Sequence, residues 1–149
     1  MKTKYQKSAA VRTLEDLAYK AKLDRFPDFP YPIKTLYRDD TSNGLTACII
    51  EFLTLKCHQA ERINSTGRQV IKNGDWKWIN GSSTKGTADI SSTIAGKSVK
   101  IEVKIGNDRQ SEYQKRYQQS IERAGGLYYI ARNFNDFLSW YNLKFLCHE

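Results

Sequence analysis

The sequence predicts a single α/β domain in which a small mixed central sheet is flanked by helices. Segments with helical spacing alternate with short β-like runs, in the order helix, strands, helix, strand, helix. The 149 residues suffice to bury a substantial core, and the hydrophobic fraction of 40% with a charged fraction of 27% is that of a soluble globular protein. No apolar run has the length of a membrane span.

Residues 1–44 are predicted to form a basic, aromatic extension ahead of a domain at 45–149. The segment 11–21 has helical spacing. One side of this helix carries Val11, Leu14, Leu17, Ala18 and Ala21. Prolines and aromatic residues are interleaved over 26–37, which suits an extended arm that packs its aromatics onto the body, or equally a dimer contact.

A second helix is expected from Leu45 to about Glu61, after a helix-start cluster at 40–44. Its apolar stripe consists of Leu45, Cys48, Ile49, Phe52, Leu53, Cys57 and Ala60. Glu51 falls on the edge of this stripe, where a helix can offer a carboxylate to a neighbouring sheet, although a glutamate on a helix surface is usually solvated. The three cysteines lie in or beside apolar segments and are interpreted as buried free thiols in a reducing cytosol.

Short strands are expected next. The segment 62–67 has the pattern of a short strand that ends in a turn, and Asn73-Gly74 is the strongest hairpin signal in the chain. Trp76 and Trp78 share one strand face with Lys77 between them. Aromatics interleaved with cations can stack on nucleic-acid bases, but a tryptophan pair on one face more commonly belongs to a core.

The stretch 86–104 is the centre of the chain. From Ser98 onward the residues alternate. An apolar face carries Val99, Ile101, Val103 and Ile105, and a polar face carries Ser98, Lys100, Glu102 and Lys104. Asp89 opens a second β-like run, and a hairpin through 95–97 brings the two runs together, so that two acids and a lysine converge at one end of a sheet. On its own, Glu102-Val103-Lys104 is typical of a solvated strand face.

The C-terminal third is predicted to contain a helix, a strand and a helix. Ser111 and Gln114 fit a capping box, and Gly125-Gly126 ends that helix. Its inner stripe is expected to consist of Tyr113, Tyr117, Ile121 and Ala124. A strand follows at 127–131, and Asn133 or Asn135 caps a last helix whose inward residues are Phe134, Phe137, Leu138, Tyr141 and Phe145.

The formal net charge of +8 and the sequence pI of about 9.4 suit a polyanionic partner, of which nucleic acid is the commonest, and suit equally a protein that is merely soluble and basic. The candidate DNA-binding residues are Arg62, Lys85, Lys100, Arg109, Lys115 and Arg116. His58 and His148 each follow a cysteine but lack paired metal-ligand spacing. The N-terminus has no apolar segment after its basic residues, so a cytoplasmic protein is expected.

Phosphodiester hydrolysis needs a hard divalent cation, and carboxylate oxygens are the ligands that Mg²⁺ prefers. Asp89 and Glu102 are the candidate metal ligands, with the backbone carbonyl of Val103 as a third and Glu51 as a further ligand, direct or through water. Lys104 beside the metal would orient the attacking water or stabilise the phosphorane.

Several of these residues together resemble the PD-(D/E)XK nuclease superfamily. The matching pattern is Gly86-Thr87-Ala88-Asp89, Ile101-Glu102-Val103-Lys104, Gln114 in the next helix, and Ala124-Gly125-Gly126 before an aromatic strand. The match is closest to the VRR-NUC branch, whose small stand-alone members occur in phages and bacteria. It covers about residues 45–140, and Ala88 stands where that family often has proline.

The resemblance implies a restriction-endonuclease-like core. It assigns metal binding to Asp89, Glu102 and Val103, and catalysis to Lys104. Gln114 corresponds to the glutamine in the family's following helix, and Glu51 corresponds to the acidic residue in its first helix. It also implies a bacterial or phage-encoded homodimer that cuts branched or structured DNA, such as Holliday junctions, with Mg²⁺ or with Mn²⁺ in its place. Two alternatives remain: a non-catalytic nucleic-acid-binding module of the same fold, and a basic structural protein whose acids are solvated.

Overall fold

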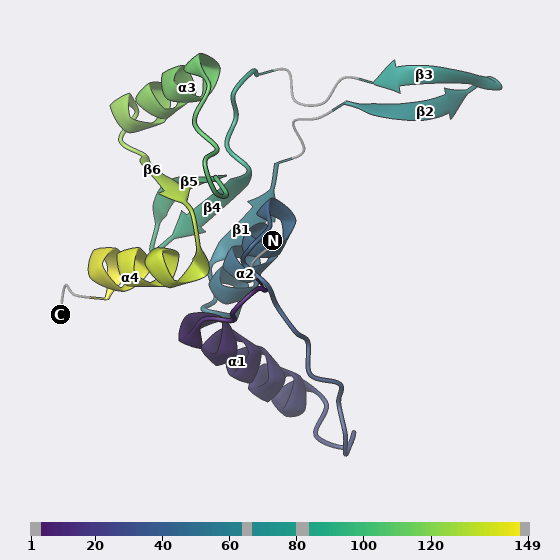
Figure 1. Ribbon diagram of the computed structural model, residues 1–149, viewed down its shortest axis with the longest axis vertical. Coiled ribbons are helices and arrows are strands. Elements are labelled where there is room, and N and C mark those ends of the chain that lie inside the picture. Colours follow the sequence, from purple (N-terminus) through teal and green to yellow (C-terminus); the bar gives the residue numbers. More distant parts are fainter. Residues whose placement is uncertain (1–3, 64–66, 80–83, 147–149) are drawn as a thin grey trace.

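The computed structural model describes residues 4–63, 67–79 and 84–146. In these ranges it has four helices, a four-stranded mixed sheet and a separate two-stranded hairpin (Figure 1). The helices are α1 (Ala9–Arg25), α2 (Ser42–Leu55), α3 (Glu112–Arg123) and α4 (Phe134–Phe145). The strands are β1 (Gln59–Arg62), β2 (Arg68–Lys72), β3 (Asp75–Ile79), β4 (Ile90–Ile94), β5 (Lys97–Val103) and β6 (Leu127–Ala131). The predicted mixed α/β class is confirmed, while the nuclease-like core stays a prediction.

The central sheet has the strand order β1-β4-β5-β6. The pairs β1–β4 and β4–β5 are antiparallel, and β6 runs parallel to β5 because the chain crosses over through α3. The apolar side chains of β5 pack with α2 and α4 on one face of the sheet, whereas α3 contacts Glu102 on the other face (Figure 1). The sheet therefore has a dry apolar face and a face on which polar side chains meet α3.

One hydrophobic core joins the helices to the sheet. Its fully buried members include Val11 and Leu14 from α1, Ile49 from α2, Ile101 from β5 and Phe137 from α4. The segment assigned to an N-terminal extension thus contributes a helix to the same core. The boundary at residue 45 itself stays a prediction.

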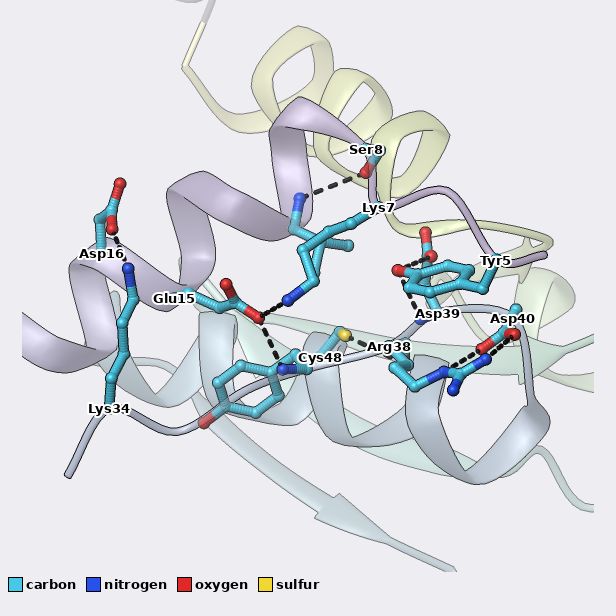
Figure 2. A network of polar contacts seen from close by, with 12 residues as sticks. Tyr5, Lys7, Ser8, Glu15, Asp16, Lys34, Arg38, Asp39, Asp40 and Cys48 are labelled. Carbon is cyan, nitrogen blue, oxygen red and sulfur yellow. Dashed lines mark hydrogen bonds and ion pairs between the residues drawn. The ribbon is translucent and has the colours of Figure 1, made fainter.

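A polar network holds the N-terminal segment against the body (Figure 2). The Tyr5 hydroxyl donates to Asp39 Oδ1 at 2.9 Å, and Asp39 Oδ2 accepts from the backbone N–H of Phe134, the first residue of α4, at 3.0 Å. Buried Glu15 in α1 accepts from Lys7 Nζ at 2.5 Å and from the Tyr37 amide at 2.8 Å. Burial by itself raises the pKa of Glu15, but these two donors hold the pKa below its usual value.

The second helix ends earlier than the sequence predicts. The backbone N–H of His58 bonds to the carbonyl of Leu53, and the N–H of Cys57 bonds to that of Thr54, with Cys57 at a φ of 61°. This is a Schellman C-cap in which cysteine occupies the left-handed position that glycine usually takes. The prediction of a helix to about Glu61 was therefore wrong, and the residues from Gln59 form β1. Cys48 is buried as expected, Cys57 is exposed, and Cys147 lies outside the described residues.

The arm after α1 is extended but does not pack its first aromatics onto the body. Phe26, Phe29 and Tyr31 are 53%, 58% and 85% exposed, whereas Tyr37 packs against the core. The packing interpretation was wrong for these three residues because the chain has no secondary structure between α1 and α2 that would turn them inward.

Both predicted hairpins are confirmed. Asn73-Gly74 joins β2 to β3 and Ala95-Gly96 joins β4 to β5, and all four residues have positive φ, as a type I′ turn requires. The first hairpin projects away from the central sheet (Figure 1). Its Trp76 and Trp78 are exposed, so their interpretation as a core pair was wrong.

The C-terminal elements begin and end where the sequence predicts, and Asn133 caps α4. The expected inner stripe of α3 is only half-buried at Tyr117 and Ile121, and it is exposed at Tyr113 and Ala124. The helix lies on the polar face of the sheet and has no apolar layer to bury against. No helix in the described ranges combines the length and apolarity needed to cross a bilayer.

Candidate active site

Asp89 lies at the end of the central sheet, directly before β4. Its Oδ2 accepts a hydrogen bond from the backbone N–H of Val103 at 2.8 Å, and its carbonyl accepts from the N–H of Ile63 at 2.8 Å. These contacts tie the aspartate to the last residue of β5 and to the residue after β1. The convergence of the two β-like runs predicted from the sequence is therefore confirmed at the level of the backbone.

Glu102 and Lys104 are buried, with exposed fractions of 2% and 6%. Lys104 Nζ lies 3.1 Å from Glu102 Oε1 and 3.5 Å from Asp108 Oδ2. The interpretation of this strand face as solvated was wrong, because α3 and β6 close over it. Val103 between them faces the core, as expected.

Glu102 is an unusual carboxyl group in this fold. Burial raises its pKa, the negative charge of Asp89 raises it further, and contact with Lys104 lowers it only in part, which leaves the pKa at about 7. The Asp89 carboxylate thus lies close enough for its negative charge to act on Glu102. Their ionised forms repel each other unless a cation lies between them.

The oxygen and the nitrogen of the Gln114 side-chain amide make hydrogen bonds to different partners. Its Oε1 accepts from the N–H of Ser111 at 2.9 Å and completes the capping box of α3, while its Nε2 donates to Glu102 Oε1. The sequence offered a capping role and a site role as alternatives, and the contacts provide for both. The cap therefore couples the start of α3 to the orientation of the Glu102 carboxylate.

The loop before Asp89 is packed against the start of α3. Gly86 has a φ of 78°, and a Cβ at this position would lie 2.4 Å from the backbone carbon of Tyr113. An open pocket at this junction is lined by Lys85, Gly86, Thr87 and Gln114, among others. Lys85 Nζ lies 5.4 Å from the centre of the Tyr113 ring.

Sequence reasoning missed Tyr128 and Arg132. The Tyr128 hydroxyl donates to Glu102 Oε2 at 3.4 Å, and both burial and the Glu102 charge raise the pKa of Tyr128. Arg132 Nη1 donates to the carbonyls of Gly106 and Asp108, both at 3.3 Å, and so holds the turn beside Lys104. In the parallel pairing of β6 with β5, Tyr128 lies opposite Lys100. Tyr128 could therefore have been found only by aligning these two strands.

Glu51 is not brought to this cluster. Asn43, near the start of α2, accepts from Arg62 Nη2 at 2.7 Å, which places that end of α2 at the sheet edge that carries Asp89. Glu51 is eight residues further along, about 12 Å down the helix axis. It lines a groove between α1 and α2, where its charge helps burial to raise the pKa of Tyr37 to about 12. No contact of Glu51 with Asp89 or Glu102 is found among the described residues, and its place in the metal site stays a prediction.

The six candidate DNA-binding residues are distributed around the cluster. Arg62 ends β1 beside Asp89, and Lys100 shares the strand face of Glu102 and donates to Ser91 Oγ at 2.5 Å. Lys115 pairs with Glu112 at 2.7 Å on the first turns of α3. Arg109 and Arg116 are exposed, on the turn before α3 and on α3 itself.

The donor set has the chemistry that Mg²⁺ prefers, since two carboxylates are available near one backbone carbonyl. Among the described residues, no hydrogen bond to the second oxygen of Asp89 is found. Within the same ranges, no group of three or more His, Cys, Asp or Glu side chains is placed to hold a metal. The residues therefore fit an ion that keeps several waters and takes one or two carboxylates, and do not fit an all-protein cage.

Comparison with models of known protein families and with curated proteins finds no match. The family resemblance therefore stays a prediction that rests on the residues and their arrangement.

Proposed function

We propose that this chain is a metal-dependent DNA endonuclease that hydrolyses phosphodiester bonds. The observation that carries the proposal is the buried pair of Glu102 and Lys104, in contact with Gln114, Tyr128 and Asp108 near the half-buried Asp89 at the end of the sheet. Burying a carboxylate and an ammonium is costly, and replacing such a pair by apolar residues is often neutral or stabilising. A site that keeps both charges beside a second acid has the residues that phosphoryl chemistry needs.

Asp89 and Glu102 would hold Mg²⁺, with the Val103 carbonyl as a further ligand, and Mn²⁺ is expected to substitute. When bound, the ion polarises the phosphate and lowers the pKa of a bound water. Lys104 supplies a positive charge whose position is fixed from two sides by Glu102 and Asp108. Preorganised charge of this kind stabilises a developing anion without reorganisation.

DNA is the proposed substrate because the chain has a formal net charge of +8 and basic side chains surround the cluster. Branched or structured DNA, such as a four-way junction, is the proposed form. A homodimer would place two sites on two strands of such a junction. The exposed aromatic residues of the arm at 26–36 are the proposed contact between two copies.

The test uses purified protein with a labelled four-way junction, a flap, a single strand and a linear duplex. Each is incubated with Mg²⁺, with Mn²⁺ and with EDTA, and the panel is repeated for Asp89→Ala and Lys104→Ala. The proposal predicts metal-dependent cutting of a branched substrate that both substitutions abolish, and binding that weakens steeply with salt. Binding without cutting on every substrate would instead identify a non-catalytic nucleic-acid-binding module, and cutting that survives both substitutions would refute the site.

A further inference from the structure

The β2–β3 hairpin exposes two tryptophans on one face. Cross-strand pairing places Trp76 opposite Ile71 and Trp78 opposite Gln69, so these four side chains share that face. The exposed fractions of Trp76, Trp78 and Ile71 are 68%, 63% and 63%. Large apolar side chains gathered on an exposed surface mark an interaction site more often than chance exposure.

The position of Trp78 is constrained. A Cβ at Gly67 would lie 2.5 Å from two atoms of the Trp78 indole, so the glycine backbone packs directly against that ring. This contact covers one part of the indole and leaves the remainder open. Tryptophan offers a large rigid surface at low conformational cost, so an indole held in this way is a preformed stacking platform.

The charges of the hairpin favour an anionic partner. The segment 67–79 contains three basic residues and one acidic residue. Lys77 lies between the two tryptophans in the sequence, so it points to the opposite face and is exposed there, as is Lys72. One face of the hairpin is therefore aromatic, and the opposite face carries Lys72 and Lys77 together with Asp75, which pairs with Lys72 in the register.

The hairpin is also placed next to the proposed active site by the chain itself. It is inserted between Ile63 and Asp89, whose backbones are hydrogen-bonded to each other at the sheet edge. Ile63 precedes the hairpin and Asp89 follows it, and both lie at the end of the sheet where Asp89 bonds to Val103. A DNA strand bound at this end would therefore lie beside residues that flank the hairpin in the chain.

We propose that the Trp76–Trp78 face binds unpaired bases of DNA by stacking, as a second DNA-binding site beside the active site. Two residues along a strand span about 6.8 Å, which is twice the step of about 3.4 Å between stacked bases. Each indole therefore offers its ring to a separate base. Aromatic rings that stack on successive bases, combined with nearby cations, are the usual means of holding single strands. The inference rests on the proposed function in one respect, namely that DNA is the ligand.

The experiment measures binding of a fluorescein-labelled 12-nucleotide oligo-dT by anisotropy, in EDTA and low salt so that no cutting occurs. We expect the double variant Trp76→Ala/Trp78→Ala to bind at least about tenfold more weakly than the wild type. The matched variant Trp76→Phe/Trp78→Phe keeps two aromatic rings and is expected to bind within about threefold of the wild type. Gly67→Ala keeps both tryptophans and every charge but displaces the Trp78 indole, and is expected to weaken binding severalfold.

The proposal is overturned if the double alanine variant binds oligo-dT as tightly as the wild type. It is also overturned if the double phenylalanine variant binds oligo-dT as weakly as the double alanine variant. Sedimentation velocity tests the rival occupant. If the wild type sediments as a dimer, and the double alanine variant as a monomer with unchanged affinity for oligo-dT, this face binds a second copy of the chain and not DNA. Because binding is measured without metal, a wild type that cuts no substrate but binds oligo-dT through its tryptophans refutes the nuclease proposal alone. If the wild type cuts DNA, and the double alanine variant binds oligo-dT as tightly as the wild type, only the stacking site is refuted.

Discussion

The Glu102 carboxylate of β5 and the ammonium of Lys104, just after that strand, lie 3.1 Å apart and are both almost fully removed from solvent. Ion pairs of this kind gain little net stability, because the loss of hydration offsets the attraction between the charges. Glu102 has a further disadvantage, since Asp89 is a second negative charge nearby. The cluster therefore lowers stability, and perturbed titratable groups of this kind are commonest at functional sites, in line with the proposed function.

This reduction is measurable as a pH dependence. The pKa of Glu102 is about 7 in the folded chain against an ordinary value of 4.5. Between these two pH values the folded state binds more protons than the unfolded state, so the free energy of unfolding falls as the pH rises. We expect this group to remove about 3 kcal/mol between pH 4.5 and pH 8 in metal-free protein. Urea unfolding in EDTA at pH 5 and pH 8 measures it.

The matched comparison for this prediction uses Glu102→Gln and Glu122→Gln. Glu122 is an exposed carboxylate on α3, so its removal should leave the pH dependence as in the wild type. Glu102→Gln should lose most of the difference between pH 5 and pH 8. If the glutamine variant of Glu102 retains the wild-type pH dependence, the burial of this carboxylate has no energetic consequence and the account of the cluster is wrong.

At the scale of elements, the junction between the loop before Asp89 and the start of α3 positions the site. Gly86 allows the loop to approach the backbone of Tyr113, and the capping box at Ser111 orients Gln114 toward Glu102. A helix cap is worth about 1 kcal/mol in stability. Here it also sets the direction of a side chain that contacts the candidate metal ligand.

Gly86→Ala tests this junction against Gly96→Ala. Both glycines have nearly the same positive φ, 78° and 77°, so both alanine variants carry the same backbone strain of about 1 kcal/mol. Only Gly86 faces a neighbour, because the added Cβ would lie 2.4 Å from the backbone of Tyr113 and nothing lies within 4 Å at Gly96. We expect Gly86→Ala to lower the free energy of unfolding by at least about 1 kcal/mol more than Gly96→Ala. Chemical denaturation measures both, and equal losses would show that the loop does not pack on α3.

The helix ends show which part of the fold was predictable. At the end of α3, Gly125 takes the left-handed position of a Schellman cap, and the sequence predicted that end correctly. At the end of α2, Cys57 takes the same position with the same hydrogen bonds, and nothing in its residue type indicates this. A helix end is thus predictable when glycine takes the left-handed position and unpredictable from residue type when another residue, such as the exposed Cys57, takes it.

The site divides in a similar way. Asp89, Glu102, Lys104 and Gln114 were found from strand alternation, a hairpin signal, a capping pattern and a family resemblance. Tyr128 was missed because its contact depends on a parallel register set by a crossover, which no local pattern encodes. Glu51 was included because helical spacing gives the face of a residue but not the neighbour that the face meets, and that neighbour is α1.

For the whole molecule, α1 belongs to the same folding unit as the sheet. Leu14 is 1% exposed within the common core, and the polar contacts of Glu15 and Asp39 hold the N-terminal segment in place (Figure 2). A separate extension would be lost without consequence for the remainder of the chain. A helix that shares the core cannot be removed without exposing apolar surface of α2 and α4.

Leu14→Ala is therefore expected to destabilise the entire protein by about 2–5 kcal/mol. Circular dichroism and near-ultraviolet absorbance should report one common transition at a lower midpoint. The control is Leu23→Ala on the same helix, where the side chain is 37% exposed and the expected loss is below about 1 kcal/mol. A first transition confined to α1, followed by an unchanged main transition, would instead support an independent N-terminal extension.

We propose that Asp89 and Glu102 together form the centre of a metal-dependent nuclease and that Glu51 lies outside it. The most direct test is the single-turnover rate of four-way-junction cleavage in Mg²⁺ for the wild type, Asp89→Asn and Glu51→Gln. Each variant removes one negative charge and keeps nearly the same side-chain size. The account predicts a loss of at least about 100-fold for Asp89→Asn and a rate within about threefold of the wild type for Glu51→Gln. Equal rates for the wild type and Asp89→Asn, or an equal loss in both variants, would contradict it.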